Sequence, residues 1–482
     1  MEVEKVVAAA IFIVYIIGML VIGVIFRRRA ERSAADFWKA AGELGLLPLT
    51  FSICSLYVSG AGTIGIPGSV WASGASLFAP VVAICGLTYI MAYLLLILPF
   101  RKLAGITPAD FLVKRYESPR LMRCVAGVIS AVTTWFYVIP QVIVGGILLD
   151  LVVGIPFEYG IAIISLTYII YTFLGGMWSV AWTDVVQGII LFGGCIAFGA
   201  YLTIIGGGYA PLLERAAAAR PAFAAVHNPL TVAGMWYVWL MYTLAWPAMV
   251  MRIFTGKDPA TIRKAFLLSG FLHLTYAILL WIPGGAWAAI LYPTLGGLMK
   301  SPDYALPAAI IHLCGPLVLA VFASVIAAAC MSTSDALLLS ASACIVNDVV
   351  RTFKPEISDR LQIRLGRILI IVLGLLAMLF VYYRVPLIYM IVAMAVGATI
   401  SAFLFPMILG LYWSRITKWG ALSGILGGII TYCLLFLTKA VPTYSELIFG
   451  SAVSLALTLI VSAITRPPSK EVKDWLASLR AG

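Results

Sequence analysis

The chain has 482 residues, of which 63% are hydrophobic and 11% are charged, and its mean hydropathy is +1.06. Soluble domains are typically about 45–50% apolar and about 25% charged. A water-soluble fold is therefore excluded, and the composition predicts a polytopic membrane protein. The net charge of +12 does not indicate a nucleic-acid partner, because the basic residues lie in short groups between long apolar stretches.

The first apolar stretch, residues 6–26, is expected to remain as a helix. Glu2 and Glu4 precede it and a run of three arginines follows it. A secretory signal peptide instead carries its positive charge in front of a shorter apolar core. The eight cysteines lie singly, without a Cys-x-x-Cys pair, and are interpreted as small core residues rather than as disulfides or metal ligands.

A helix needs about 20 apolar residues to cross a bilayer, and irregular backbone cannot face lipid. On this basis the sequence predicts an all-α membrane protein with thirteen transmembrane helices in a single transporter domain, residues 1–482. A short external helix is expected at 305–313 and a short cytoplasmic tail at 467–482. The expected spans are 6–26, 45–70, 76–100, 122–150, 158–176, 182–206, 231–254, 264–292, 315–348, 364–384, 386–413, 418–439 and 444–466.

An odd number of spans places the two termini on opposite sides of the membrane. With the N-terminus outside, all but six of the 32 Lys and Arg residues fall on the cytoplasmic side, as the positive-inside rule requires. The protein is therefore expected in the cell membrane with its C-terminus in the cytoplasm. The six basic residues expected outside are Lys5, Arg215, Arg220, Lys300, Arg384 and Lys439.

Two of the spans contain helix breakers. Residues 50–68 of the second span are rich in Ser and Gly and end in Ile-Pro-Gly, and the seventh span contains Trp246-Pro247. Spans two to six (45–206) and seven to eleven (231–413) form two groups of five, which have opposite orientations because five is odd. Interrupted helices at matching positions of inverted repeats indicate a midplane binding site. The alternative is that glycine and proline only allow close helix packing.

The ninth span carries hydroxyl groups and a carboxylate deep within an apolar run, in Ser332-Thr-Ser-Asp335. Ala329 lies three and four residues before Ser332 and Thr333, so one helix face presents a backbone carbonyl beside two hydroxyls. A hard cation takes oxygen ligands of this kind, and carbonyls freed by the break in the second span would complete its site. The alternative is that these hydroxyls only hydrogen-bond neighbouring helices.

Other residues allow two interpretations each. Asp184, near the expected start of the sixth span, either caps that helix or adds negative charge for an ion. His273 is more often a satisfied polar group than a proton relay. Tyr137 and Trp239 either line a central pocket or belong to the core. The sequence contains no metal-ligand spacing, phosphate loop or nucleophile–base arrangement, so no enzyme activity is expected.

Short motifs resemble those of the sodium:solute symporter family, which contains the proline, pantothenate, iodide and sodium/glucose carriers. The resemblance extends from the first span to the twelfth, and the motifs look closest to the pantothenate and monocarboxylate branch. The motifs are Tyr57–Gly68, Gly154–Glu158, Gly175–Gln187, Arg252 ahead of Lys257-Asp258, Ala329–Thr333, and Leu411–Arg415 leading to Gly420–Gly424.

The resemblance implies the fold of the leucine transporter: two inverted five-helix repeats with one helix before them and two after. Some members hold a second sodium at the aspartate equivalent to Asp184. Here Asp335 and Ala336 replace serines of that site, so a second ion remains an open question. The conserved sodium site of the family corresponds to backbone oxygens or hydroxyls of Ser55, Val58, Ala329, Ser332 and Thr333.

The expected function is sodium-coupled uptake of a small organic solute by alternating access, with Na⁺, the solute and the bilayer as partners and no oligomeric partner required. A carboxylate is the favoured solute, because the N-terminal end of a broken half-helix favours anions. Amino acids and sugars are alternatives, as are a passive facilitator and a transporter-like sensor module. Tyr57 replaces an aspartate of the proline carrier. The residues expected at the solute are Tyr57, Ser59, Gly60, Tyr137, Gln141, Trp239 and Tyr242.

Overall fold

The computed structural model describes residues 2–103, 105–152, 154–295, 297–382 and 388–480, and these residues form helices and no strands. The helices are α1 (Glu2–Ala30), α2 (Ala34–Lys39), η1 (Ala40–Gly42), α3 (Leu46–Ser55), η2 (Ala61–Gly65), α4 (Ile66–Ser73), α5 (Ala75–Ile84), α6 (Leu87–Leu95), α7 (Ile97–Leu103), α8 (Pro108–Tyr116), α9 (Leu121–Phe136), α10 (Val138–Val152), α11 (Phe157–Ile205), α12 (Tyr209–Ala219), η3 (Pro221–Ala224), α13 (Pro229–Ala245), α14 (Pro247–Ile253), α15 (Pro259–Leu295), η4 (Pro302–Tyr304), α16 (Ala305–Ala343), η5 (Cys344–Val350), α17 (Arg351–Phe353), α18 (Asp359–Tyr382), α19 (Ile388–Tyr412), α20 (Lys418–Thr438), α21 (Glu446–Ile464) and α22 (Lys470–Arg480).

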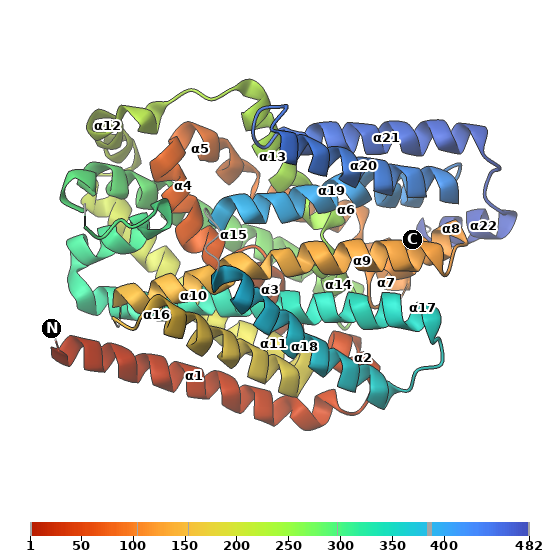
Figure 1. Cartoon of the computed structure of the whole chain (residues 1–482), viewed down its shortest axis with the longest axis horizontal. Helices are drawn as coiled ribbons and strands as arrows, with labels where there is room; N and C mark the ends of the chain where they lie inside the picture. Colours follow the sequence, from red (N-terminus) through yellow and green to blue (C-terminus); the bar gives the residue numbers. More distant parts are fainter. Residues whose placement is uncertain (1, 104, 153, 296, 383–387, 481–482) are drawn as a thin grey trace.

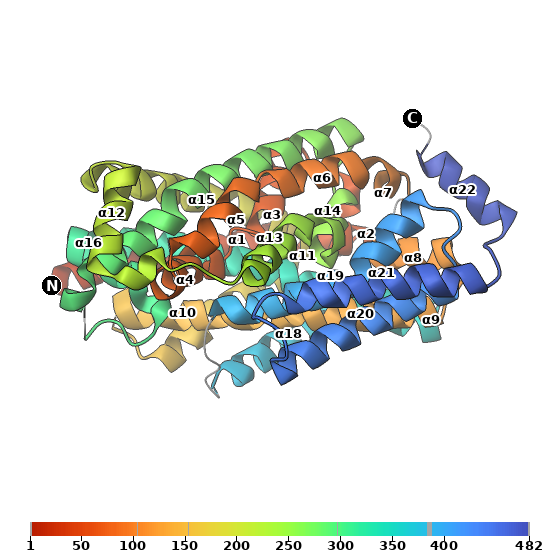
Figure 2. The same cartoon turned by 90° about the horizontal axis from the view of Figure 1, so that it is seen from above.

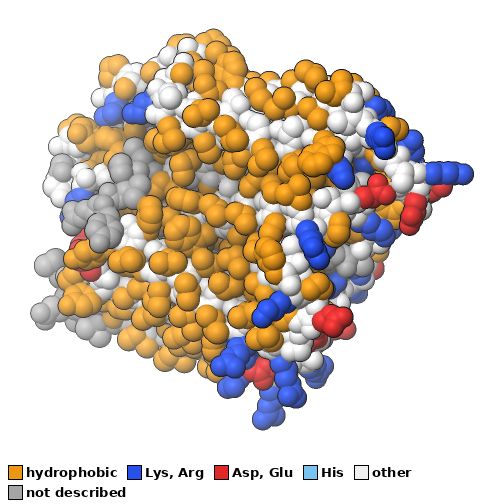
Figure 3. Space-filling model, turned by 45° about the vertical axis from the view of Figure 1, so that its right-hand side comes forward, with side chains coloured by type: hydrophobic (Ala, Val, Ile, Leu, Met, Phe, Trp, Pro, Cys, Tyr) orange, Lys and Arg blue, Asp and Glu red, His pale blue; other side chains and the backbone are white. Residues whose placement is uncertain are grey.

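Ten helices within the described residues are long and apolar enough to cross a membrane, which confirms the prediction of a polytopic membrane protein. Most of them run along one common direction, and the two termini lie at opposite ends of it (Figures 1 and 2). Hydrophobic side chains cover the middle of the surface, whereas Lys and Arg side chains gather toward one edge (Figure 3). An apolar surface bordered on one side by cationic residues is expected of a protein that sits in a bilayer.

The two spans in which the sequence contains helix breakers are interrupted in the structure. The first helix stops at Ser55 as α3 and resumes as η2 and α4. The second stops at Ala245 as α13 and resumes as α14 at Pro247, with Trp246 in an extended conformation (ψ 120°). Proline lacks an N–H and disfavours a helical conformation in the residue before it, which explains this second break. Both breaks lie where the sequence analysis expected them.

Glycine divides two of the longest helical elements. Within α11, Gly176 has φ 50° and ψ −141°, so the fifth and sixth expected spans meet at this residue. A Cβ atom at position 176 would stand 2.6 Å from the carbonyl oxygen of Phe37. Glycine is therefore required there for both conformation and space. Within α16, Gly315 (φ 79°) separates the expected external segment 305–313 from the rest of the helix.

Two features were expected at the ends of spans: a boundary between two neighbouring spans and a short C-terminal tail. The expected boundary between spans 364–384 and 386–413, and Arg384 itself, lie outside the described residues. The expected tail contains the amphipathic helix α22, whose Val472, Leu476 and Leu479 are buried and which packs against α7 and α8. The sequence analysis did not anticipate that this segment folds onto the helices.

An ion-pair network ties α8, α9 and η5 together. Arg123 lies 2.9 Å from the carboxylate of Asp110 and 3.4 Å from that of Asp348. The hydroxyl of Thr107 donates to Asp348 Oδ1 at 2.8 Å. A buried carboxylate needs such partners, and these fix the segment after α7 against the end of α16.

Candidate functional site

The break after Ser55 lies against the middle of α16. Thr333 Oγ1 donates to the carbonyl oxygens of Ser55 at 2.5 Å and Ala329 at 3.1 Å. Ser332 Oγ donates to the same Ala329 carbonyl at 3.4 Å. Val58 lies three residues beyond Ser55, inside the break, and is fully buried. The fold thus brings Ser55, Ala329, Ser332 and Thr333 into contact and keeps Val58 in the adjoining turn.

The oxygens gathered here suit a small hard cation. Carbonyl and hydroxyl oxygens are the ligands such cations take, and all of the residues involved are buried. Clusters of His, Cys, Asp and Glu suited to other metals are absent from the described part of the chain. An ion held between α3 and α16 would take the place of the Thr333–Ser55 hydrogen bond and link the same two helices. The donor set therefore fits Na⁺.

A small aromatic cavity lies beside the break. Its free volume is about 10 Å³, room for roughly one water molecule. The Tyr57 hydroxyl donates to the Trp239 carbonyl at 2.6 Å, and Trp239 Nε1 donates to the Tyr389 hydroxyl at 2.6 Å. The residues lining it, none of them charged, are Tyr57, Ser59, Ala61, Gly62, Ile66, Tyr137, Trp239, Trp281, Tyr389 and Val392.

Three of the residues expected at the solute lie behind this cavity wall. The Tyr242 hydroxyl donates to the Leu56 carbonyl at 2.9 Å, and its ring centroid lies 4.1 Å from that of Tyr57. Gln141 is fully buried, and neither its amide nitrogen nor its amide oxygen has a hydrogen-bond partner among the described residues. Gln141 Oε1 lies 3.1 Å from where a Cβ atom on Gly60 would stand. An unpaired buried amide is costly, so Gln141 is a polar group left available beside the break.

Trp281 of α15 and Tyr389 of α19 also line the cavity, and the sequence analysis did not name them. Tyr389 lies at the start of α19, where an aromatic residue has the same sequence signature whether it belongs to an interface belt or to a pocket, and Trp281 lies inside α15, where it is indistinguishable from a core residue. For Tyr389 the fold decides between the two cases, because its side chain is buried and its hydroxyl accepts from Trp239.

A second buried cluster carries charge. Asp184 of α11, Asp335 of α16 and Arg252 of α14 are at most 1% exposed and interact electrostatically. Arg252 Nε donates to Ser52 Oγ at 3.0 Å, whereas its Nη2 has no partner among the described residues. Asp335 accepts from the Ala336 backbone N–H at 2.5 Å and from Thr183 Oγ1 at 3.4 Å.

The interpretation of Asp184 as a helix cap is wrong. The second half of α11 begins directly after Gly176, so Asp184 lies about two turns inside the helix, where backbone N–H groups already have partners. Both of its carboxylate oxygens lack a hydrogen bond among the described residues. Arg252 is a buried group of opposite charge that acts on it electrostatically without a direct ion pair, and from the sequence it was noted only as part of a motif and as a cytoplasmic basic residue.

His273 also departs from the simple expectation of a satisfied polar group. Its Nδ1 lies 3.4 Å from the Tyr89 hydroxyl, but its Nε2 has no partner among the described residues. The ring packs against Tyr57, with centroids 4.5 Å apart. His273 thus supports the aromatic wall from behind and does not line the cavity.

The chain resembles known transporters along almost its whole length. The model of the sodium:solute symporter family matches residues 37–428. The high-affinity proline transporter PutP of Bacillus subtilis is 27% identical over 95% of this chain and 98% of its own length. The sodium/pantothenate symporter of Escherichia coli is 24% identical over 90% of this chain and 91% of its own. A structure described as the substrate-bound outward-open state of a Na⁺-coupled sialic acid symporter has a TM-score of 0.80 at 21% identity, covering 96% of this chain and 99% of that one.

These similarities confirm the family resemblance found in the motifs, and the TM-score indicates a shared fold. The identities of 27% and 24% to carriers of different solutes do not separate one branch of relatives from another. A particular solute, and the placement nearest the pantothenate and monocarboxylate branch, therefore remain predictions.

The charge cluster predicts a non-additive pair of substitutions. Arg252→Met leaves Asp184 and Asp335 buried without a cation and is expected to destabilise the protein by roughly 3–5 kcal/mol. Adding Asp335→Ser removes one of the two carboxylates and is expected to restore part of that loss. Thermal unfolding of the purified protein in detergent measures both, with Lys264→Met, an exposed residue at the start of α15, as the control. Effects that simply add, within about 0.5 kcal/mol, would contradict the pairing.

Proposed function

Because the chain belongs to the sodium:solute symporter family, we propose that it carries a small organic solute together with Na⁺ into the cell by alternating access. It is a transporter of this family and not an enzyme, and Na⁺ is its coupling ion. The observation that carries the proposal is the contact of Ser55, Ala329, Ser332 and Thr333 across the helix break. These residues, with Val58, are the proposed sodium ligands.

In the proposed architecture the chain crosses the membrane thirteen times. Ten helices meet the length and hydropathy criterion. Three further crossings come from counting the two halves of α11 separately at Gly176 and from adding the interrupted helices α3–α4 and α13–α14, which are absent from those ten. The proposal groups residues 45–206 and 231–413 as inverted repeats, each of which begins with an interrupted helix. Paired breaks of this kind support a binding site at the repeat interface.

Sodium is proposed to stabilise the solute-competent state by joining the break to α16. Ser55 belongs to the first repeat and Thr333 to the second, so an ion between them favours one relative position of the two repeats. Solute affinity then depends on sodium through a shift in that equilibrium. The aromatic cavity has room for roughly one water molecule, so solute binding requires Tyr57, Trp239 or Tyr389 to move.

A second cation is proposed at Asp184 and Asp335. The two carboxylates and the Arg252 guanidinium leave one negative charge when all three are ionised, and a monovalent cation would balance it. The two proposed sites adjoin the same segment, because the Ser55 carbonyl accepts from Thr333 while the Ser55 hydroxyl donates to the carbonyl of Ser52, whose own hydroxyl accepts from Arg252. Asp335→Ser removes this negative charge and restores one serine of the two-sodium pattern that the family resemblance implies. An unchanged Hill coefficient for sodium in that variant would argue that this site does not set the stoichiometry.

The proposed solute is a small carboxylate. No charged side chain lines the cavity, so the supporting groups are the N-terminal end of η2 and the unpaired amide of Gln141. Helix N-termini favour anions, and an amide supplies an N–H donor. Gly60, Ser59, Tyr137, Trp239, Tyr242 and Tyr57 are the remaining proposed contacts. An amino acid or a sugar is the alternative, and the relatives carry solutes of different kinds.

Uptake into proteoliposomes tests the function. With an inward sodium gradient, we expect one member of a panel of carboxylates, amino acids and sugars to accumulate above its outside concentration. Replacing the gradient by equal sodium on both sides should abolish accumulation and leave exchange. Solute that equilibrates at the same rate with and without sodium would instead identify a passive facilitator.

The proposed orientation, with the N-terminus outside and the C-terminus inside, is tested by cysteine labelling. Lys257 precedes α15 and Lys300 follows it, and 37 helical residues span about 55 Å. In a variant lacking the eight native cysteines, a cysteine at position 300 should react with an impermeant reagent from outside, and one at 257 should not. Equal labelling of the two positions in intact cells would contradict this topology.

Removing the Thr333 hydroxyl tests the sodium site. Backbone ligands survive side-chain changes, so Thr333→Ala deletes one of two removable oxygens and should cost about 1–3 kcal/mol. Apparent sodium affinity should therefore fall by about 5- to 150-fold. Thr333→Ser keeps the oxygen and is the matched control, with a much smaller effect expected. By linkage, solute affinity should fall in low sodium and recover at saturating sodium.

Unchanged sodium binding in the hydroxyl-deleted variants would contradict the proposed sodium site. If Ser332→Ala and Thr333→Ala bind sodium like the parent but unfold at lower temperature, the hydroxyls only hold helices together. The sodium site must then lie elsewhere.

A further inference from the structure

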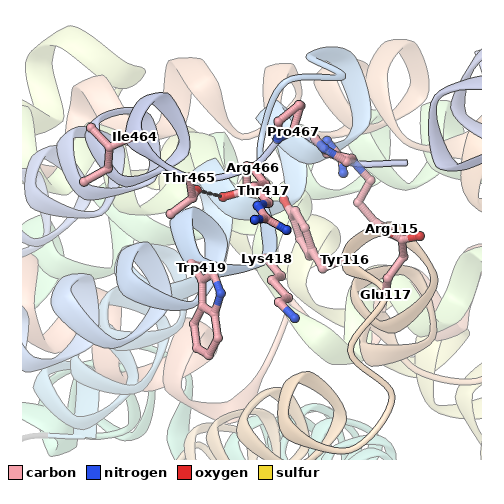
Figure 4. Close-up of a pocket in the computed structure, with 11 residues that line it drawn as sticks. Arg115, Tyr116, Glu117, Thr417, Lys418, Trp419, Ile464, Thr465, Arg466 and Pro467 are labelled. Atoms are coloured by element: carbon pink, nitrogen blue, oxygen red, sulfur yellow. Dashed lines mark hydrogen bonds between the residues drawn. The ribbon is translucent and has the colours of Figure 1, made fainter. Parts of the chain in front are cut away.

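A second, larger cavity lies far along the helices from the aromatic cavity. It has a volume of about 540 Å³ and is formed where α8 ends, α20 begins and the chain leaves α21 toward α22 (Figure 4). Since α20 and α21 are both long enough to cross a membrane, the start of one and the end of the other mark a membrane surface. The lining residues are Arg115, Tyr116, Glu117, Thr417, Lys418, Trp419, Ile464, Thr465, Arg466, Pro467 and Pro468.

Positive charge predominates in this cavity. Arg115, Lys418 and Arg466 line it together with a single carboxylate, that of Glu117. The Glu117 carboxylate accepts a hydrogen bond from Ser469 Oγ at 2.7 Å. Behind the wall, Arg415 donates to the carbonyl of Thr465 at 3.2 Å and adds a further cation. The net charge of the lining therefore favours an anionic ligand.

Arg115 forms part of the cavity wall, and one of its guanidinium nitrogens has no hydrogen-bond acceptor among the described residues. Its side chain is fully buried. Nε donates to the Gly410 carbonyl at 2.6 Å and Nη2 to the Trp413 carbonyl at 3.1 Å. These bonds fix the guanidinium, but Nη1 has no partner among the described residues. A buried, charged donor without an acceptor is costly, so this nitrogen indicates an acceptor supplied by a ligand.

The N-terminus of α20 meets the same cavity. Thr417 caps this 21-residue helix by accepting from the Gly420 backbone N–H, and Lys418 and Trp419 form its first turn. The first N–H groups of a helix and its dipole favour a negative group. The same cavity is therefore lined by the N-terminus of α20, by Arg115 and by the exposed side chains of Lys418 and Arg466.

Apolar side chains border the cations. Trp419 is 50% exposed and Ile464 is 80% exposed, and both lie at the ends of membrane-length helices. Tryptophan at such a position is typical of the headgroup level of a bilayer. The cavity therefore offers a cationic part and an adjoining apolar part, which matches a ligand with a phosphate and acyl chains.

We propose that this cavity binds the phosphate headgroup of an anionic phospholipid from the membrane leaflet on the side of α22. Arg115 Nη1, Lys418, Arg466 and the α20 N-terminus hold the phosphate oxygens, and Trp419 and Ile464 contact the acyl chains. A bound lipid would join α8 and α20 to the segment leading to α22. A free phosphate shares the headgroup chemistry but lacks the apolar contacts.

The test is a lipid titration of the full-length protein purified in detergent. Unfolding temperature is measured against added dioleoylphosphatidylglycerol, dioleoylphosphatidylcholine or inorganic phosphate at equal concentrations. Phosphatidylglycerol should stabilise the protein at the lowest concentration. The variant Lys418→Ala/Arg466→Ala should weaken that apparent affinity about 25-fold, because each cation near an anionic surface contributes about fivefold. Both side chains are exposed, so folding should be retained.

The charge-matched control is Lys264→Ala/Lys354→Ala, which removes two exposed cations away from the cavity, and its affinity should change by less than about twofold. Three results would overturn the proposal. One is equal stabilisation by phosphatidylcholine. Another is stabilisation by inorganic phosphate that matches phosphatidylglycerol, which would assign the cavity to a soluble anion. The third is an equal loss of affinity in the control variant.

Discussion

The structure depends on a hydrogen bond between the end of a broken helix, α3, and the continuous part of α16 that follows Gly315. Ending α3 at Ser55 frees a backbone carbonyl in the protein interior, where an unpaired polar group is costly, and Thr333 of α16 supplies the partner at 2.5 Å. Because the two residues lie in different proposed repeats, this one contact links them. A sodium ion bound between the same oxygens would therefore stabilise one relative position of the two proposed repeats.

The aromatic cavity is positioned by the same break. Tyr57 lies two residues beyond Ser55, and its hydroxyl reaches the Trp239 carbonyl, while Trp239 in turn donates to Tyr389. The hydrogen bonds run from the break through α13 to α19, so the proposed ion site and the cavity share the segment that follows Ser55. The Gln141 amide beside Gly60 and the indole N–H of Trp281, which lines the cavity, have no partner among the described residues and remain available for a solute.

Sequence patterns predicted the parts of this site that have a local cause. The Ser- and Gly-rich run predicted the first break, Trp246-Pro247 predicted the second, and the spacing of Ala329, Ser332 and Thr333 predicted a shared helix face. The missed parts depend on tertiary contacts. Arg252 has the sequence signature of a cytoplasmic basic residue, and only the fold brings it close enough to Asp184 for the two charges to interact. For Asp184 the sequence left a helix cap and an ion role open, and the positive φ of Gly176, which places the helix start about two turns earlier, excludes the cap.

The most direct test of sodium's role is hydrogen–deuterium exchange of the purified protein in sodium and in N-methylglucamine at equal ionic strength. The account predicts slower amide exchange with sodium in peptides spanning 50–65 and 326–338, and loss of that protection in Thr333→Ala. Exchange in both segments that is the same with and without sodium would contradict the claim that the ion joins the broken helix to α16.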